Sequence, residues 1–268
     1  MRVIINADDF GYDPDTVSAT INCFGCNTLT SASIMPNMPA TTEALTFASR
    51  HSQFSFGVHL TYAANTTERP LCDPFTLPSL TTKTGYFLPA GRVRLAAICG
   101  RISLEEVERE TTAQLALVHD YGIRISHVDS HCHLHKFGVF QRALCEVLGR
   151  FGIRRVRAVQ NVYVRSPWRR PTFWFSSFSG KRLRRSFVTT DYMFMSRKHG
   201  DDGWWKGIND MLSSEGDLEV GVHPGSIEHW RRQQARGAAE FATLCRQSGV
   251  PLITWNEVDR VPPSEPRR

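Results

Sequence analysis

Two features are absent from this sequence of 268 residues, a long apolar run and an apolar leader, and each absence argues against a class of protein. No apolar run approaches the roughly 18 residues that a membrane-spanning helix requires. Acidic side chains appear within the first ten residues, which is too early for a secretory signal peptide. We therefore expect a cytoplasmic protein, unless a partner recruits it elsewhere.

Cysteine occurs seven times, but only one pair has the spacing of a zinc or redox motif. Cys23 and Cys26 form a single C-x-x-C, and no second copy completes a four-cysteine zinc site. We interpret the pair as two small apolar residues near the end of a helix. The seven thiols are expected to be reduced.

Acidic residues are missing between Glu146 and Asp191, although the chain as a whole carries a net charge of only +6. That stretch contains many basic residues with tryptophan and phenylalanine between them. The basic segment 150–185 could bind an anionic partner, namely nucleic acid, phosphate or an anionic membrane surface. The alternative is a solvated loop whose long side chains lie over apolar surface.

The pattern along the chain alternates between strand and helix, which is typical of a parallel α/β sheet or barrel. Helical patterns at 103–122, 139–152 and 227–249 each end on a glycine. The candidate strands are 2–7, 29–35, 54–60, 124–131, 153–159, 187–193, 217–223 and 251–256. Eight strands predict a single-domain irregular (β/α) barrel, similar to a TIM barrel.

Two long segments interrupt this alternation, and they are predicted to be loop insertions. Residues 63–102 are rich in Thr, Pro and Gly, and residues 160–186 belong to the basic segment. Long loops in a compact domain commonly serve as lids or binding loops. The barrel domain is expected to span residues 1–260, followed by a disordered tail at 261–268.

Polar residues that could act in catalysis or bind a metal lie at the ends of several predicted strands. Asp8 and Asp9 follow the first strand, His59 ends the third, His131 ends the fourth and His223 ends the seventh. Parallel strands bring their carboxyl ends together, both at the mouth of a barrel and at the crevice of a doubly wound sheet. We therefore predict that these residues share one site.

The stretch ISHVDSHCHLH, at 125–135, supplies the strongest indication of a metal or catalytic site. Its five metal-capable side chains fall on every second position: His127, Asp129, His131, His133 and His135. Side chains two residues apart in a strand point to the same face, and such a face is unusual for a core.

Not all five can be ligands, because positions 131 to 135 alone span about 13 Å in a strand. The chain is expected to leave the strand near His131. An open divalent site needs about three protein ligands, and we choose His131, His59 and one of the two adjacent aspartates. Asp129, His127, His133 and His135 would orient the ligands or contact substrate.

Several motifs, in this order, resemble those of the YdjC-like carbohydrate deacetylases, a family that includes chitooligosaccharide deacetylases. They are NADDFG at 6–11, GVHLT at 57–61, HVDSHCHLH at 127–135, TTDYM at 189–193 and VHPG at 222–225. The resemblance implies an irregular (β/α) barrel that binds one divalent metal and removes acetyl from an N-acetylated sugar by hydrolysis.

Carried over by position, the resemblance makes Asp9, His59 and His131 the metal ligands. Asp8 would be the catalytic base, and His223 a candidate acid. Asp191, within TTDYM, joins the residues expected to bind substrate or orient ligands. Two histidines and a carboxylate leave zinc, manganese, cobalt, nickel and magnesium open.

The substrate and the reaction class have alternatives. The substrate is either a free oligosaccharide that contains N-acetylglucosamine or an anionic or lipid-linked glycoconjugate that binds at the basic segment. The same ligands would suit a hydrolase of phosphate esters or cyclic amides. A nucleic-acid-binding protein is unlikely, because no recognised nucleic-acid motif accompanies the arginines. The sequence leaves a homo-oligomeric state open.

Overall fold

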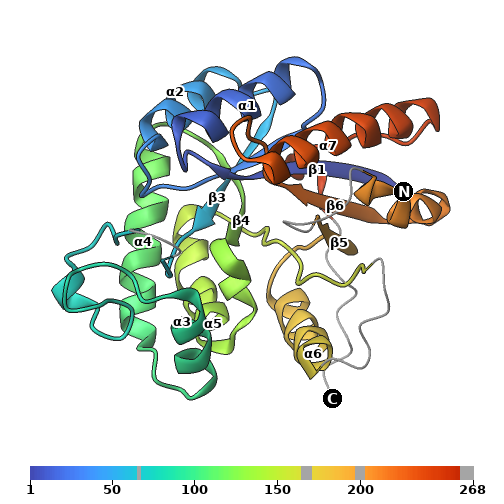
Figure 1. Ribbon diagram of the computed structural model, residues 1–268. Helices are drawn as coiled ribbons and strands as arrows, with labels where there is room; N and C mark the ends of the chain where they lie inside the picture. The colour runs from blue at the N-terminus through green and yellow to red at the C-terminus, as the bar shows by residue number, and fades with distance from the viewer. Residues whose placement is uncertain (65–67, 164–170, 197–202, 260–268) are drawn as a thin grey trace.

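The computed structural model describes residues 1–64, 68–163, 171–196 and 203–259. Six parallel strands form one curled sheet in the order β4-β3-β2-β1-β6-β5. The strands are β1 (Arg2–Phe10), β2 (Ser31–Ile34), β3 (Ser55–Leu60), β4 (Ile125–Ser130), β5 (Tyr192–Met195) and β6 (Asp217–Val222). The predicted barrel-like α/β fold is confirmed, as an incomplete barrel of parallel strands surrounded by helices (Figure 1).

Helices cover the outside of the curled sheet and shield its apolar residues from water. They are α1 (Pro14–Gly25), α2 (Thr41–Arg50), α3 (Ala90–Ile98), α4 (Leu104–Asp120), α5 (Gly138–Val147), α6 (Pro171–Ser186) and α7 (His229–Gln247). In Figure 1, α1, α2 and α7 lie along one side of the sheet, while α4 and α5 pack together on another. Strands β1, β2, β3 and β6 are almost entirely buried, as expected for a parallel sheet covered by helices.

The three helices predicted from glycine-terminated patterns are confirmed. Ser103 caps α4, since its hydroxyl accepts a hydrogen bond from the amide of Glu106. Glu106 does not complete the capping box, because its carboxylate instead accepts hydrogen bonds from the amide and hydroxyl of Ser79. The cap therefore also ties α4 to the insertion at 63–102.

Two of the eight predicted strands are wrong. Residues 153–159 contribute only single bridges, from Val156 to Val128 and from Arg155 to Val188. Residues 251–256 give one bridge, between Leu252 and Val3, because the hydroxyl of Thr254 and the carboxylate of Glu257 start a 3₁₀ turn there. The strand predicted at 187–193 begins later in the structure, because β5 starts at Tyr192.

The two predicted insertions contain regular structure in their described parts. Residues 63–102 include α3 and a 3₁₀ turn at Pro74–Thr76. Residues 160–186 include α6, which packs against α5 and the segment that follows β4. The predicted tail at 261–268 lies outside the described residues.

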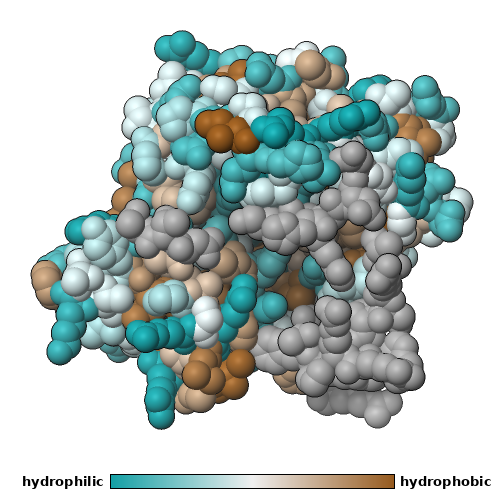
Figure 2. All heavy atoms as spheres, viewed as in Figure 1, coloured by the Kyte–Doolittle hydropathy of each residue, from teal (hydrophilic) through white to brown (hydrophobic). Residues whose placement is uncertain are grey.

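No helix in the described ranges is long and apolar enough to cross a bilayer. The face shown in Figure 2 is largely hydrophilic where it is coloured, with hydrophobic side chains in separate small patches. One of the exposed hydrophobic side chains is Phe178 on α6, which is 73% exposed.

Candidate metal and catalytic site

A bulge at the end of β1 brings both adjacent aspartates into one site. The register between β1 and β2 shifts between Ala7 and Phe10, and Asp9 adopts a left-handed backbone with φ of 61°. In a regular strand neighbouring side chains point to opposite faces, whereas a bulge re-aims one of them. Aspartate tolerates the left-handed region better than most residues. Asp8 and Asp9 are both buried.

Asp9 lies between two histidines from distant strands. Its Oδ1 is 3.5 Å from Nε2 of His59 and 3.3 Å from Nδ1 of His131. Candidate ligand atoms of these three residues lie within 4.8 Å of one another. The spacing and the donor set, two imidazoles and one carboxylate, fit a divalent metal site with open positions.

The electrostatics of the trio also suit a cation. Burial alone would raise the pKa of Asp9, but a hydrogen bond from His131 and the charges of His223, His131 and His59 hold it well below its usual range. Asp9 Oδ1 is buried and accepts no hydrogen bond of ordinary geometry. A buried ionised oxygen that lies 3.3 and 3.5 Å from two imidazole nitrogens is the arrangement expected where a metal binds.

Asp129 holds His59 in the orientation that the trio needs. Its Oδ1 lies 2.8 Å from Nδ1 of His59, which leaves Nε2 of that ring directed toward Asp9. A carboxylate behind a ligating histidine fixes the tautomer and raises ligand basicity. Burial disfavours the charge of Asp129, yet Arg157 and His59 together lower its pKa below the usual value.

Sequence reasoning missed the role of Arg157, which is fully buried at the centre of the site. Its guanidinium binds Asp8 through two hydrogen bonds, of 2.6 and 2.7 Å. It also contacts Asp129 at 2.5 Å and Glu219 at 2.8 Å. Burial raises the pKa of Glu219 to about 7, although Arg157 acts in the opposite direction. Arg157 therefore contacts three carboxylates next to Asp9, His59 and His131, the three residues called the metal trio below.

His127 is a packed core residue with satisfied nitrogens. Its ring stacks on Trp255 with centroids 4.5 Å apart, and its nitrogens face the hydroxyls of Ser33 and Ser126. Burial lowers the pKa of His127 to about 3, so the ring is neutral near pH 7. Ser33 in turn donates to Asp129, so His127 reaches the site through that hydroxyl.

The remainder of the histidine run turns away from the strand, as predicted. Strand β4 ends at Ser130, and Cys132 and His133 adopt left-handed backbones with φ of 58° and 54°. His135 is buried and pairs its Nδ1 with the hydroxyl of Ser130, while His133 is only half-buried. The alternation of five side chains on one face therefore stops where the 3₁₀ segment His131–Lys136 begins.

His223 and Asp191 lie at opposite ends of the sheet. His223 follows β6 at the site end, where its amide and Nδ1 face Oε1 of Gln234 and its charge acts on Asp9. Asp191 precedes β5, and its carboxylate accepts a hydrogen bond from the amide of Asp217 at the start of β6. The structure therefore brings His223 to the site but not Asp191.

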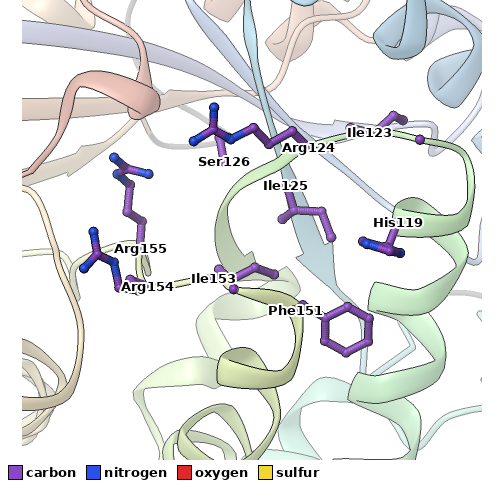
Figure 3. Close-up of a pocket in the computed structure, with 11 residues that line it drawn as sticks. His119, Ile123, Arg124, Ile125, Ser126, Phe151, Ile153, Arg154 and Arg155 are labelled. Atoms are coloured by element: carbon purple, nitrogen blue, oxygen red, sulfur yellow. The ribbon is translucent and has the colours of Figure 1, made fainter.

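The described basic residues of segment 150–185 lie in three separate places. Arg157 is buried in the site, while exposed Lys181, Arg182 and Arg185 lie on α6. Arg154 and Arg155 line a cavity of about 430 Å³ at the start of β4, the end of that strand away from His131 (Figure 3). An anionic partner for the basic segment stays a prediction, and Arg165, Arg169 and Arg170 lie outside the described residues.

Comparisons with known proteins show which family this chain is similar to. The sequence model of the family described as YdjC-like protein matches residues 2–250. A carbohydrate deacetylase of Geobacillus stearothermophilus is 33% identical over 263 residues, covering 95% of this chain and 96% of that protein. The human carbohydrate deacetylase is 32% identical over 160 residues, which covers 59% of this chain and 48% of that protein.

One solved structure shares the whole fold. It is a putative cellobiose-phosphate cleavage protein of Enterococcus faecalis, with a TM-score of 0.79 and 24% sequence identity. The match covers 97% of this chain and 99% of that one. It supports the barrel-like arrangement of strands on which the site is built.

Proposed function

Because the chain belongs to the YdjC-like protein family, we propose that it hydrolyses the N-acetyl group of a sugar that contains N-acetylglucosamine, releasing acetate and a free amine. The carbohydrate deacetylase named from Geobacillus stearothermophilus supports the reaction class. The observation that carries the proposal is the buried trio of Asp9, His59 and His131, whose candidate ligand atoms lie within 4.8 Å of one another.

Asp9, His59 and His131 would hold one divalent ion, which is zinc, magnesium, manganese, cobalt or nickel. When bound, such an ion polarises an amide carbonyl and lowers the pKa of a water molecule. Asp129 keeps Nε2 of His59 available by binding its Nδ1 at 2.8 Å. The chain thus supplies the ligands and the group that orients one of them.

Asp8 is assigned as the general base and His223 as the general acid. Arg157 donates a hydrogen bond to each oxygen of Asp8, which fixes the carboxylate beside the trio. In this position Asp8 would accept a proton from the attacking water. Gln234 fixes the ring of His223 by facing its Nδ1 at 3.0 Å, so Nε2 is the nitrogen left to protonate the leaving amine. His133 and His135 would orient the ligands or contact substrate.

A second substrate class is favoured by one observation on α6. Exposed Lys181, Arg182 and Arg185 and the exposed ring of Phe178 lie on this helix, which packs against the segment that carries His131. Cationic and apolar side chains together suit an anionic or lipid-linked glycoconjugate. Cytoplasmic location and any homo-oligomeric state stay predictions.

Acetate release from a panel of N-acetylated sugars tests the proposal. The panel runs from N-acetylglucosamine and chitobiose to nucleotide-linked and lipid-linked forms, each with added divalent metals. We expect Asp8→Asn to lose about 10²- to 10⁴-fold in turnover while still binding metal. Acetate release that survives this substitution would remove Asp8 as the base. Phosphate release without acetate would instead favour a phosphate ester hydrolase.

The salt dependence of the reaction separates the two substrate classes. Activity on uncharged chitobiose that is insensitive to salt supports the free oligosaccharide. Activity restricted to anionic or lipid-linked forms, and weakened by salt, supports the surface on α6.

A further inference from the structure

Arg231 contacts the metal trio from a helix that the sequence motifs do not include. It lies in the first turn of α7 and is only 6% exposed. Its Nη2 donates to Oδ2 of Asp9 at 3.0 Å, and its Nε donates to Oε2 of Glu228 at 3.0 Å. The guanidinium is therefore fixed at one end by a surface carboxylate and at the other by the proposed ligand.

This contact distinguishes the two oxygens of Asp9. Oδ2 is engaged by Arg231, whereas Oδ1 faces His59 and His131 and accepts no hydrogen bond of ordinary geometry. A carboxylate can bind a metal through one oxygen or both. Because Arg231 binds Oδ2 and both histidines face Oδ1, Oδ1 is the oxygen better placed for a metal.

The surroundings of Arg231 are shaped to hold it. The guanidinium carbon lies 4.5 Å from the centre of the Trp230 ring and 5.7 Å from that of Tyr12. A Cβ at position 225 would lie 2.6 Å from Cδ of Arg231. Gly225, the last residue of the VHPG motif, therefore leaves the space that this side chain fills.

We propose that Arg231 is a positioning residue that restricts Asp9 to ligation through Oδ1 and thereby sets the metal affinity of the site. The inference rests on the proposed metal site and goes further by naming the residue that orients its carboxylate ligand. Groups that orient metal ligands typically change affinity about 10- to 100-fold when removed.

Titration calorimetry of zinc into the metal-free protein tests this role. Arg231→Gln is expected to weaken binding about 10- to 100-fold, and Arg231→Lys to recover part of the loss because its ammonium can still reach Oδ2. Arg236→Gln is the matched control, since Arg236 lies on the same helix and pairs with Glu240 at the surface. That control should bind zinc as the wild type does.

Two outcomes separate this inference from the proposed function. If wild type binds zinc and Arg231→Gln binds it equally or more tightly, Arg231 does not position the ligand. If His59→Ala binds zinc as tightly as wild type, the metal site itself is wrong. Recovery by lysine at an unchanged unfolding temperature would show that the effect is on the ligand, not on folding.

A different observation concerns the cavity at the start of β4. It is lined by residues 122–126 and 151–155 together with His119, and none of its described lining residues is acidic. Figure 3 shows the guanidinium groups of Arg124, Arg154 and Arg155 on one side, with Phe151 and His119 on the other. Buried Ile123 and Ile153 give the cavity an apolar floor.

The three arginines are close enough to repel one another. Arg155 is fixed by hydrogen bonds to the carbonyls of Val258 at 2.6 Å and Asn256 at 2.9 Å. Burial lowers the pKa of Arg155, and the charges of Arg154 and Arg124 lower it further. Among the described residues, no carboxylate pairs with Arg124 or Arg154, although Asp259 acts on Arg155 from a distance.

We infer that this cavity binds the phosphate group of a small molecule, at a site separate from the metal trio. Arg124 and Arg154, with the nitrogen of Arg155 that donates to no carbonyl among the described residues, supply donors to phosphate oxygens, and a bound anion relieves the repulsion among the three charges. Its volume of about 430 Å³ lies within the range of small-molecule sites.

Phosphate binding by the full chain, measured by calorimetry with inorganic phosphate, tests this site. The double variant Arg124→Gln with Arg154→Gln is expected to weaken binding at least tenfold. Arg50→Gln with Arg101→Gln removes the same charge from exposed positions elsewhere and should bind normally. Equal weakening in both double variants, or no phosphate binding by wild type, would overturn the inference.

Discussion

Arg154 and Arg157 are three residues apart, yet they illustrate opposite uses of the same side chain. Arg157 is fully buried and contacts Asp8, Asp129 and Glu219, whereas Arg154 is exposed at a cavity without acidic lining residues. At the site end Arg157 pairs with three buried carboxylates, while at the opposite end Arg124 and Arg154 have no carboxylate partner among the described residues. The role of an arginine therefore depends on the partners that the fold places near it, and not on the composition of its segment.

Arg157→Met should give the largest effect, because it removes the only cation that contacts all three carboxylates among the described residues. Stranding buried charges in this way typically costs about 3–5 kcal/mol. Urea unfolding should show a loss of that size, and turnover should fall together with stability because Asp8 loses its fixed orientation. A stability change below about 1 kcal/mol would mean that the carboxylates become protonated or solvated at little cost.

Glu219→Gln should change how stability depends on pH. Burial raises the pKa of Glu219 from its usual 4.5 to about 7, so the folded protein keeps a proton that the unfolded chain has released between these values. Stability contributed by this group is therefore present below pH 4.5 and is lost as pH rises through about 7. Glutamine does not titrate, so Glu219→Gln should not lose this stability as pH rises.

Chemical denaturation from pH 4.5 to 7 should show wild type losing roughly 2–3 kcal/mol relative to the glutamine variant. Glu215→Gln, at an exposed position, should keep the wild-type slope. Parallel curves for wild type and Glu219→Gln would show that Glu219 is ionised throughout, with Arg157 outweighing burial.

Gly57→Ala should lower the unfolding free energy by less than Arg157→Met does. A Cβ there would lie 2.4 Å from Cε1 of His127, a ring held between Trp255 and the hydroxyl of Ser33. Overpacking of this kind costs about 1–3 kcal/mol. Turnover should also fall, since Ser33 binds Asp129. Gly149→Ala is the matched control, because a Cβ at position 149 meets nothing within 4 Å.

The sequence predicted the parts of the site that follow strand ends and missed those that depend on distant partners. Asp9, His59 and His131 meet because parallel strands deliver their carboxyl ends to one edge. The left-handed backbone at Asp9 has no sequence signal beyond the tolerance of aspartate for it. Asp191 was placed at the site because it lies within the TTDYM motif, whereas it precedes β5 and binds the amide of Asp217 at the opposite end of the sheet.

Arg157 and Arg231 were missed for a related reason. Both lie in arginine-rich stretches, where each arginine resembles the next, and their acidic partners are far away in the chain. A strand alternation in 153–159 could have indicated that Arg155 and Arg157 share a face. It could not have shown that one reaches carbonyls near the surface and the other reaches buried carboxylates.

Arg154→Met should change stability least and so completes the comparison with Arg157. The side chain is exposed and has no carboxylate partner among the described residues, so removing its charge also removes repulsion from Arg155. We expect an unfolding free energy within about 0.5 kcal/mol of wild type, measured in the same urea series as Arg157→Met. A slight gain would mean that the cavity holds excess positive charge when no anion is bound. A loss comparable to that of Arg157→Met would show that the opposite end of the barrel is as tightly paired as the site.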